Sequence, residues 1–283
     1  MHTKKLRVII KKAITAAHCK LFLIFHFKTL QLKFIAKFFI LLWSVWAGFV
    51  FFGLLAIGFP IIIIPALLGS NYLKKQVWQV LRYIAKLILL LWGVRVEIKN
   101  KHLIDATGQY VYVPNHRSYL DALVVGSSIP NHIKYLGKAE VLKWPLLGFI
   151  LKHYHIPVQR DDAGSRNLSL AQMDELVKSG VSLCIFPEGT CNTTPNLLKK
   201  FHEGAFKIAI PNQIPIVPIT VIGTGELMPR NGLLLKPGKI IIYWHAPIAT
   251  TNYTANDTPQ LVEKVQQTLL EDLVRHYPNG YLS

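Results

Sequence analysis

A histidine and an aspartate five residues apart form the pattern in this sequence that is best suited to chemistry. The segment 110–114 alternates Tyr and Val and ends in a proline, so it predicts a strand that stops just before His116. Ser118 and Asp121 have the spacing of a capping box, which predicts a helix that begins at Ser118 and leaves His116 in the preceding turn. From a turn the imidazole can fold back onto the Asp121 carboxylate, whereas two helical residues at this spacing face away from each other.

Such a pair can remove a proton from an alcohol. A carboxylate bonded to one ring nitrogen sets the tautomer and leaves the other nitrogen free to accept a proton. An imidazole with a pKa near about 6.5 is matched to an alcohol that attacks a carbonyl, and this help is worth a factor of roughly 10²–10⁴ in rate. The segment alone is equally compatible with a second interpretation, in which Asp121 only caps a helix and His116 is an ordinary turn residue.

Four sequence blocks follow one another in the order found in one enzyme family. The segment 115–121 (NHRSYLD) resembles the first block of the glycerolipid acyltransferase family, the PlsC-like 1-acylglycerol-3-phosphate acyltransferases. The segments 155–160 (HIPVQR), 186–190 (FPEGT) and 214–219 (IPIVPI) resemble the second, third and fourth blocks. The resemblance extends over about residues 88–250, and four ordered blocks are far more specific than any one of them.

The resemblance implies a fold, a reaction and a set of site residues. The implied fold is α/β, with a central mixed sheet flanked by helices. The implied reaction transfers a fatty acyl group from acyl-CoA or acyl carrier protein to the sn-2 hydroxyl of 1-acylglycerol 3-phosphate (lysophosphatidic acid), which gives phosphatidic acid. In it His116 is the base and Asp121 orients His116. The implied substrate-binding residues are Asn115, Ser118, Arg160, Glu188, Gly189 and Thr190, and the fourth block, with Pro215 and Pro218, is associated with the acyl donor.

The residue types fit these roles. Arg160 follows a short β-branched run, and a guanidinium at a strand end can hold a phosphate in its planar fork, although an ion pair with Asp161 or Asp162 is the alternative. Gly189 lets backbone approach a ligand and Thr190 adds a hydroxyl, although a tight turn would use the same residues.

Some positions limit what the resemblance implies. Cys191 and Asn192 stand where the family usually has arginine and serine, and Tyr154 stands where its second block usually has glycine. The missing arginine removes one candidate contact to a phosphate. Another acceptor therefore stays open: a different lysophospholipid, a lyso-ornithine lipid or glycerol 3-phosphate. Pro215 and Pro218 predict an edge strand or a distorted strand, or plain core packing.

The elements that must position these residues alternate from residue 94 onward. Runs rich in β-branched residues predict strands, and longer patterns predict helices between them. The predicted strands are 94–98, 109–113, 133–136, 155–158, 181–186, 215–222 and 239–244, and the predicted helices are 118–128, 139–151, 165–179, 201–210 and 259–276. This alternation predicts an α/β catalytic domain over residues 94–283.

Residues 1–93 are predicted to be a basic, helical membrane anchor. Fourteen of the 32 Lys and Arg lie in the first 96 residues, which contain none of the 15 Asp and Glu. The 36 residues from Phe38 to Leu73 carry no charge. A helix needs only about 20 residues to cross a bilayer, so this run, with its apolar segment at about 38–68, is long enough to span one.

The course of the apolar segment has two possible forms. Gly58, Pro60 and Pro65 predict a kink or a break in its second half. Either a kinked helix crosses the membrane once, or a hairpin dips into the membrane and returns. Basic residues flank both ends, so the positive-inside rule does not choose an orientation.

Residues 71–92 predict an amphipathic helix. Gln76, Gln79, Arg82 and Lys86 recur at helical spacing on one face, and apolar residues occupy most of the rest. This pattern suits the headgroup boundary of an anionic bilayer. The alternative is a core helix with one solvated stripe.

Other classes of function lack support in the sequence. It contains no Walker loop, dinucleotide fingerprint or Gly-x-Ser-x-Gly motif, and its basic residues are interleaved with apolar runs that nucleic-acid-binding arms lack. His153-x-His155 has no third ligand at useful spacing, and Cys19, Cys184 and Cys191 show no metal-ligand spacing. No metal or prosthetic group is expected, and acyl-CoA or acyl carrier protein serves as co-substrate.

The expected partners are membrane phospholipids, lysophosphatidic acid and the acyl donor, with no nucleic acid. The expected location is a membrane, with the bacterial inner membrane as the first choice and the catalytic domain facing the cytosol. The rival from another class is a catalytically silent protein that binds acidic lipid through its basic anchor.

Overall fold

The computed structural model describes residues 2–68, 71–143, 148–149, 152, 155–158, 163–230, 232 and 234–281 of the 283-residue chain. Its strands are β1 (Val94–Lys99), β2 (Val111–Pro114), β3 (Ile133–Lys138), β4 (His155–Val158), β5 (Ser182–Cys184), β6 (Ile216–Ile222) and β7 (Gly238–Trp244). They form one sheet in the order β1-β7-β6-β2-β5-β3-β4. Every neighbouring pair is parallel except β6–β7, which is antiparallel, so the predicted mixed sheet is confirmed.

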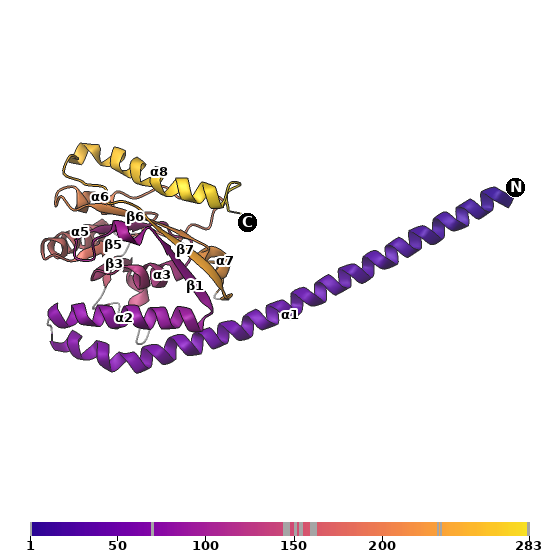
Figure 1. Cartoon of the computed structure of the whole chain (residues 1–283), viewed down its shortest axis with the longest axis horizontal. Coiled ribbons are helices and arrows are strands. Elements are labelled where there is room, and N and C mark those ends of the chain that lie inside the picture. Colours follow the sequence, from indigo (N-terminus) through magenta and orange to yellow (C-terminus); the bar gives the residue numbers. More distant parts are fainter. Residues whose placement is uncertain are drawn as a thin grey trace.

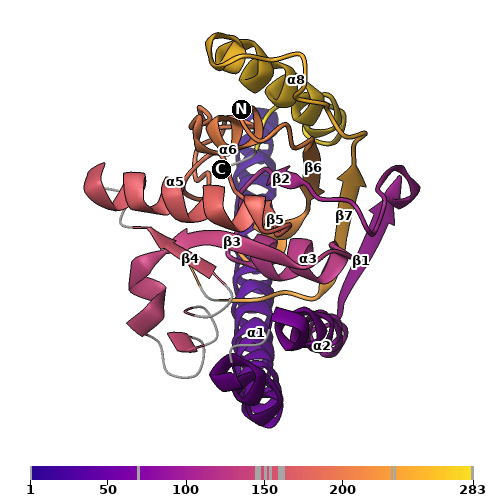
Figure 2. The same ribbon diagram turned by 90° about the vertical axis from the view of Figure 1, so that its left-hand side faces the viewer.

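Helices cover both faces of the sheet (Figures 1 and 2). One face carries α2 (Asn71–Leu91) and α3 (Leu120–Ser128), and the other carries α5 (Ala163–Lys178), α6 (Gly204–Ala209) and α8 (Thr258–His276). Tyr112 packs in the core on the α2 and α3 side, while Val111 and Val113 pack in the core on the opposite side. Successive side chains of a strand point to opposite faces, so a strand buried on both faces is apolar throughout.

Most of the predicted elements are confirmed, with ends shifted by one to three residues. Two short 3₁₀ helices, η1 (Lys101–Leu103) and η3 (Ala255–Asp257), and the helix α7 (Thr224–Leu227) were not predicted. The predicted helix 139–151 starts as a 3₁₀ helix, η2 (Ala139–Lys143). These elements are one turn long or little more, which is too short to show a periodic pattern.

The strand predicted over residues 215–222 is not an edge strand, and it begins after Pro215. β6 lies between β2 and β7, so the predicted edge position is wrong. The antiparallel ladder between β6 and β7 begins at Ile219, and the Pro218 carbonyl accepts a hydrogen bond from the backbone N–H of His245, just beyond the end of β7. Proline has no backbone N–H to donate. At position 218 the β6–β7 ladder has already ended, so no ladder hydrogen bond is lost and an internal strand can tolerate the proline.

The apolar N-terminal run forms one helix. The helix α1 (His2–Leu68) continues through Gly58, Pro60 and Pro65, so the predicted break, and with it a hairpin inside the run 38–68, does not occur. Figure 1 shows α1 curving where α2 lies alongside it. A Cβ on Gly58 would lie 2.7 Å from Ile84 Cδ1 of α2, so glycine permits the close approach of the two helices. Neighbouring helices let apolar helices tolerate prolines in this way.

Part of the polar stripe of α2 faces the α/β domain. Gln79 and Arg82 are half-buried, and both donate hydrogen bonds to the Pro130 carbonyl, Gln79 at 3.1 Å and Arg82 at 3.4 Å. The exposed surface of α2 includes large apolar side chains, among them Tyr83, Leu87, Leu90 and Leu91. Gln79 and Arg82 therefore lie neither at a bilayer headgroup boundary nor on a solvated stripe, and both predictions are wrong for these two residues. Their long polar side chains can reach a carbonyl just beyond α3 that needs a donor.

Candidate active site

The carboxyl ends of three adjacent strands meet at one edge of the sheet. His116 follows β2, Glu188 follows β5, and Gly223 with α7 follows β6. β2 lies between β5 and β6, so these segments come together although more than a hundred residues separate the first from the last. In open α/β sheets ligands bind outside the carboxyl ends of the strands, so this edge is the candidate site.

Asp121 is the centre of the turn that carries His116. Its Oδ2 accepts hydrogen bonds from the backbone N–H groups of Arg117 (2.6 Å) and Ser118 (2.7 Å) and lies 2.8 Å from His116 Nδ1. The Asp121 side chain is completely buried. The predicted contact between His116 and Asp121, and the predicted place of His116 in a turn, are confirmed.

The helix after this turn begins later than predicted. α3 begins at Leu120, whereas the sequence pattern placed its start at Ser118. The Ser118 hydroxyl accepts from the Leu120 N–H and donates to the Met228 carbonyl (2.6 Å), so it does not form its half of the capping box. Only the half in which Asp121 accepts from Ser118 is present. The chain from His116 to Ser118 is wound around the carboxylate and does not join the helix.

The environment of His116 stabilises its charged form. Burial lowers the pKa of His116, but hydrogen bonding to Asp121, the contact with Cys191 and the negative charge of Asp121 outweigh burial and raise the pKa to about 9. At neutral pH the ring in the free protein therefore holds its second proton. Asp121 orients the ring and also makes it a stronger base.

A column of aromatic rings supports His116. The Phe186 ring stacks on the imidazole with 4.2 Å between centroids, Tyr135 stacks on Phe186 at 6.3 Å, and His155 stacks on Tyr135 at 5.2 Å. Burial lowers the pKa of His155 to about 3, which keeps this ring neutral. Sequence analysis missed the column, because it joins residues of β3 and β4 to a residue beyond β5 and no spacing signals it.

Cys191 lies against the imidazole of His116. Its Sγ is 3.3 Å from Nε2 and 3.7 Å from Nδ1, and the residue is 4% exposed. A sulfur in line with the Nε2 lone pair would be much farther from Nδ1, so the thiol lies to one side of that axis. The direction along which Nε2 accepts a proton is not the direction of the thiol.

Glu188 holds the backbone of the turn. Its Oε1 accepts from the His116 N–H (2.7 Å) and its Oε2 accepts from the Lys199 N–H (3.0 Å). The His116 carbonyl accepts from the Asn192 N–H (2.7 Å). Burial raises the pKa of Glu188 to about 7, although the two backbone bonds lower it. Both oxygens already have backbone donors, and acceptor binding by Glu188 stays a prediction.

Asn115 joins two strands at the same edge. Its Nδ2 donates to the Val221 carbonyl (3.0 Å) and its Oδ1 accepts from the Val221 N–H (2.7 Å), which ties the end of β2 to β6. The residue is 1% exposed. Ser118 makes the corresponding link to Met228 beyond α7. These contacts shape the site, and direct substrate contacts of Asn115 and Ser118 stay predictions.

Gly189 and Thr190 border the same loop. Gly189 has φ +71°, and a Cβ there would lie 2.8 Å from the His202 ring, so this position requires glycine. Thr190 is exposed, and its Oγ1 accepts a hydrogen bond from Lys199 Nζ (2.5 Å). The exposed hydroxyl is accessible to a ligand, and its contact with substrate stays a prediction.

One part of the predicted site lies outside the described residues, and another lies far from His116. Arg160 lies outside the described residues, as do Tyr154, Asp161 and Asp162. Pro215 directly precedes β6, at the opposite end from the Asn115–Val221 bonds, and six residues at about 3.3 Å each separate it from that end by about 20 Å. The acyl-donor roles of Pro215 and Pro218 stay predictions.

Arg117 was not predicted as part of the site. Its guanidinium donates to the carbonyls of Asn192 (2.6 Å) and Thr194 (2.7 Å) and lies 3.8 Å from the centre of the Tyr281 ring. It therefore joins the His116 turn, the loop after β5 and the C-terminal segment. An arginine next to the histidine in sequence was the available signal, but its partners depend on the tertiary structure.

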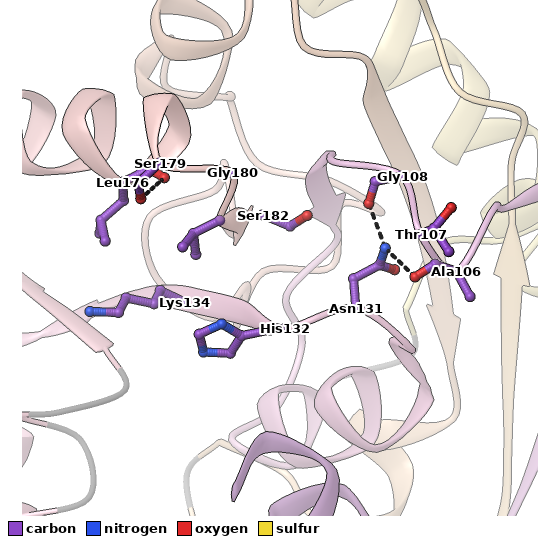
Figure 3. A pocket seen from close by; sticks show the side chains of 11 residues that line it. Ala106, Thr107, Gly108, Asn131, His132, Lys134, Leu176, Ser179, Gly180 and Ser182 are labelled. Atoms are coloured by element: carbon purple, nitrogen blue, oxygen red, sulfur yellow. Dashed lines mark hydrogen bonds between the residues drawn. The ribbon is translucent and has the colours of Figure 1, made fainter. Parts of the chain in front are cut away.

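A separate cavity lies at the opposite edge of the sheet (Figure 3). Its volume is about 450 Å³, and its lining includes residues at the amino ends of β3 and β5, such as Lys134 and Ser182. Asn131 Nδ2 donates to the carbonyls of Ala106 and Gly108 there. Among the described residues, no group of three His, Cys, Asp or Glu side chains could hold a metal ion.

The part of the chain that contains this site is similar to known proteins. Residues 95–222 match the family model described as Acyltransferase. A chloroplastic 1-acyl-sn-glycerol-3-phosphate acyltransferase of Brassica napus is 36% identical over 140 residues, which is 49% of this chain and 40% of that protein. The alpha 1-acyl-sn-glycerol-3-phosphate acyltransferase of Mus musculus is 28% identical over 215 residues, 72% of each chain. The chain therefore spans about two fifths of the plant protein's length.

The fold has a solved counterpart. The crystal structure of the 1-acyl-sn-glycerophosphate acyltransferase from Thermotoga maritima matches with a TM-score of 0.74, covering 87% of this chain and 99% of that one. At 18% sequence identity, this likeness concerns the fold alone. The family match spans β1 to β6 and includes His116, Asp121 and Glu188, so the region that resembles the acyltransferase family contains the candidate site.

Proposed function

We propose that this chain is a membrane-bound acyltransferase that moves a fatty acyl group from a thioester to the free sn-2 hydroxyl of lysophosphatidic acid. The observation that carries the proposal is the buried Asp121 carboxylate 2.8 Å from His116 Nδ1, at the carboxyl edge of the sheet. The family match over residues 95–222, and relatives named for this reaction, support it.

The mechanism is direct transfer between two substrates. Neutral His116 accepts the hydroxyl proton on Nε2 while the hydroxyl oxygen bonds to the carbonyl carbon of the thioester. The carbon–sulfur bond then breaks, and the imidazolium gives its proton to the departing thiolate, so free CoA or acyl carrier protein is released as a thiol. Asp121 stabilises the imidazolium between the two steps.

Part of the helix α1 supports a membrane location. The segment Gln31–Ile64 of α1 is long and apolar enough to cross a membrane, by length and composition. Exposed phenylalanines such as Phe34, Phe39 and Phe49 lie along it. In water such a surface is unfavourable, whereas lipid solvates it. The proposed arrangement keeps the acceptor in the membrane surface and lets the acyl donor arrive from the cytosol, with the bacterial inner membrane as first choice.

A second candidate keeps the reaction and changes the acceptor. Cys191 places a thiol beside His116 where the family usually has a cationic arginine. One positive charge for an anionic headgroup is therefore missing from this position. This favours a test of other lysophospholipids, a lyso-ornithine lipid and glycerol 3-phosphate beside lysophosphatidic acid.

The test is acyl transfer by purified, detergent-solubilised protein and by its His116→Ala variant. Labelled palmitoyl-CoA and palmitoyl-acyl carrier protein are each offered with the panel of acceptors. We expect product from lysophosphatidic acid with wild type and none with the variant. Product from a different acceptor alone would replace the substrate. Folded protein that binds liposomes but turns over no acceptor would favour a catalytically silent lipid-binding protein.

A further inference from the structure

The loop after α7 joins the membrane helix to the candidate active site. This bridging loop comprises residues 228–230 and 234–237. At one end, the Met228 carbonyl accepts from the Ser118 hydroxyl (2.6 Å) beside His116. At the other end, the Leu235 N–H donates to the Ser44 hydroxyl of α1 (2.9 Å). The loop is therefore held at both ends, with one end at the His116 turn and the other at the predicted membrane segment.

Arg230 lies in this loop close to the site. Its guanidinium carbon is 4.5 Å from the centre of the Tyr119 ring. Burial lowers the pKa of the Arg230 guanidinium, whereas the nearby Cys191 and Tyr119 side chains raise it. Cys191 in turn lies 3.3 Å from His116 Nε2. Arg230 is half-buried, and none of the ion pairs formed among the described residues includes it.

Two other cations at this edge already have partners. Arg117 donates to two backbone carbonyls and stacks on Tyr281. Lys199 Nζ bonds to the Thr190 hydroxyl. Arg230, in contrast, lies against the Tyr119 ring, and no carboxylate among the described residues forms an ion pair with it. A guanidinium has five N–H donors, so donors remain available for a phosphate.

We infer that Arg230 binds the phosphate of the acceptor and supplies, from the bridging loop, the positive charge that Cys191 does not supply. This rests on the proposed function, and it names the residue that selects an anionic acceptor. The attachment to α1 suits the role, because the headgroup of a membrane-embedded lysolipid and Arg230 would then share the membrane surface. Tyr119 lies against the guanidinium and helps to hold it at this place.

Equilibrium binding tests this role separately from turnover. Binding of labelled lysophosphatidic acid in detergent micelles is compared with binding of 1-acylglycerol, which lacks the phosphate. We expect Arg230→Gln to weaken binding of lysophosphatidic acid by about 10- to 100-fold, as for loss of a charged hydrogen-bonded pair, and to change binding of 1-acylglycerol less than about twofold. Lys264→Gln, which removes an exposed charge on α8, should change neither affinity.

A conservative variant separates charge from structure. Arg230→Lys keeps the charge but loses the planar fork, so it should recover most of the affinity lost in Arg230→Gln. Thermal unfolding of both variants should match wild type. The inference would be overturned if Arg230→Gln weakened the binding of lysophosphatidic acid and of 1-acylglycerol equally. It would also be overturned if the binding of lysophosphatidic acid did not change.

Turnover is measured on the same wild-type preparation. Charge-dependent binding without acyl transfer would reject the proposed reaction and keep the phosphate site. Acyl transfer to lysophosphatidic acid, with affinity independent of Arg230, would keep the reaction and reject the phosphate site.

Discussion

Two regions of the molecule arrange polar and apolar groups in opposite ways. One is the edge of the sheet at His116, and the other is the helix pair α1 and α2. At the edge, Asp121 and Glu188 are buried, and they accept hydrogen bonds from backbone groups and from His116. In the helix pair, Gln79 turns inward to a backbone carbonyl while Leu87 and Leu90 face outward. The α/β domain therefore has the polarity of a protein in water, and the exposed surface of α1 and α2 that of a protein in lipid.

The difference supports the proposal that the two regions contact different solvents. A buried carboxylate is tolerated only where donors surround it, and the turn at His116 provides backbone donors at the end of a strand. An apolar helix surface is stable only where lipid or protein covers it. The polar groups of α2 that face the domain would be costly in lipid, and the domain supplies them with the Pro130 carbonyl.

Removal of the base His116 should lower the activity more than any other change proposed here. His116→Ala removes the group that accepts the acceptor proton in the proposed mechanism, so kcat/KM should fall about 10³- to 10⁴-fold. The assay is acyl transfer with labelled thioester. His102→Ala, at an exposed histidine outside the site, should keep full activity. Activity of His116→Ala within tenfold of wild type would contradict the assigned role of this edge.

Replacing the orienting carboxylate should have the next largest effect, and it should change the pH profile. A base accepts a proton only when it is neutral, so kcat/KM of wild type should rise with pH up to the His116 pKa of about 9 and level off above it. Asp121→Asn removes the group that raises this pKa, so the midpoint should move to lower pH while kcat/KM above it falls about 10²- to 10³-fold.

The control for this profile is Asp105→Asn, in an exposed turn at the opposite edge of the sheet. It should leave both the midpoint and kcat/KM unchanged. An unmoved midpoint in Asp121→Asn would show that the contact with Asp121 does not set the basicity of His116.

Two adjacent leucines of α2 test the outward polarity of the helix pair. Leu90 is 72% exposed and Leu89 is 2% exposed. Leu90→Asp should weaken liposome binding by up to about 3 kcal/mol with little change in thermal unfolding in detergent. Leu89→Asp should lower the unfolding temperature instead, because it buries a charge. Equal liposome binding by wild type and Leu90→Asp would remove lipid as the solvent of this face.

The smallest expected effect concerns the inward polar contacts of α2. Gln79→Ala loses the hydrogen bond to the Pro130 carbonyl and the one accepted from Arg82, and it should destabilise the protein by about 1 kcal/mol in chemical unfolding. Gln76→Ala, at an exposed position one helical turn earlier, should be neutral. Equal effects of the two substitutions would mean that the inward contact adds nothing to stability.

The elements that the sequence predicted well are those with a long, local pattern. β4 was predicted with its observed ends, and α8 begins one residue before its predicted start. The contact between His116 and Asp121 was also predictable, because both residues lie in one turn. Pro218 misled the prediction, because the cost of a proline depends on where the neighbouring ladder ends, which its own sequence does not reveal.

The site residues that sequence reasoning missed all depend on distant segments. Phe186 reaches His116 only because β5 pairs with β2. Arg230 reaches Tyr119 and the His116 turn because the bridging loop is tied to Ser118 and to α1. Neither contact follows from spacing along the chain.

By itself the sequence determined the α/β alternation, the apolar N-terminal helix and the pairing of a histidine with a carboxylate, because periodicity and turn chemistry act over a few residues. Only the tertiary structure decided that β6 is internal, that α1 continues through its prolines, and that Glu188 and Cys191 lie against the His116 turn. These outcomes depend on strand order and helix packing. Such long-range contacts are selected by the burial of the whole core and not by any local pattern.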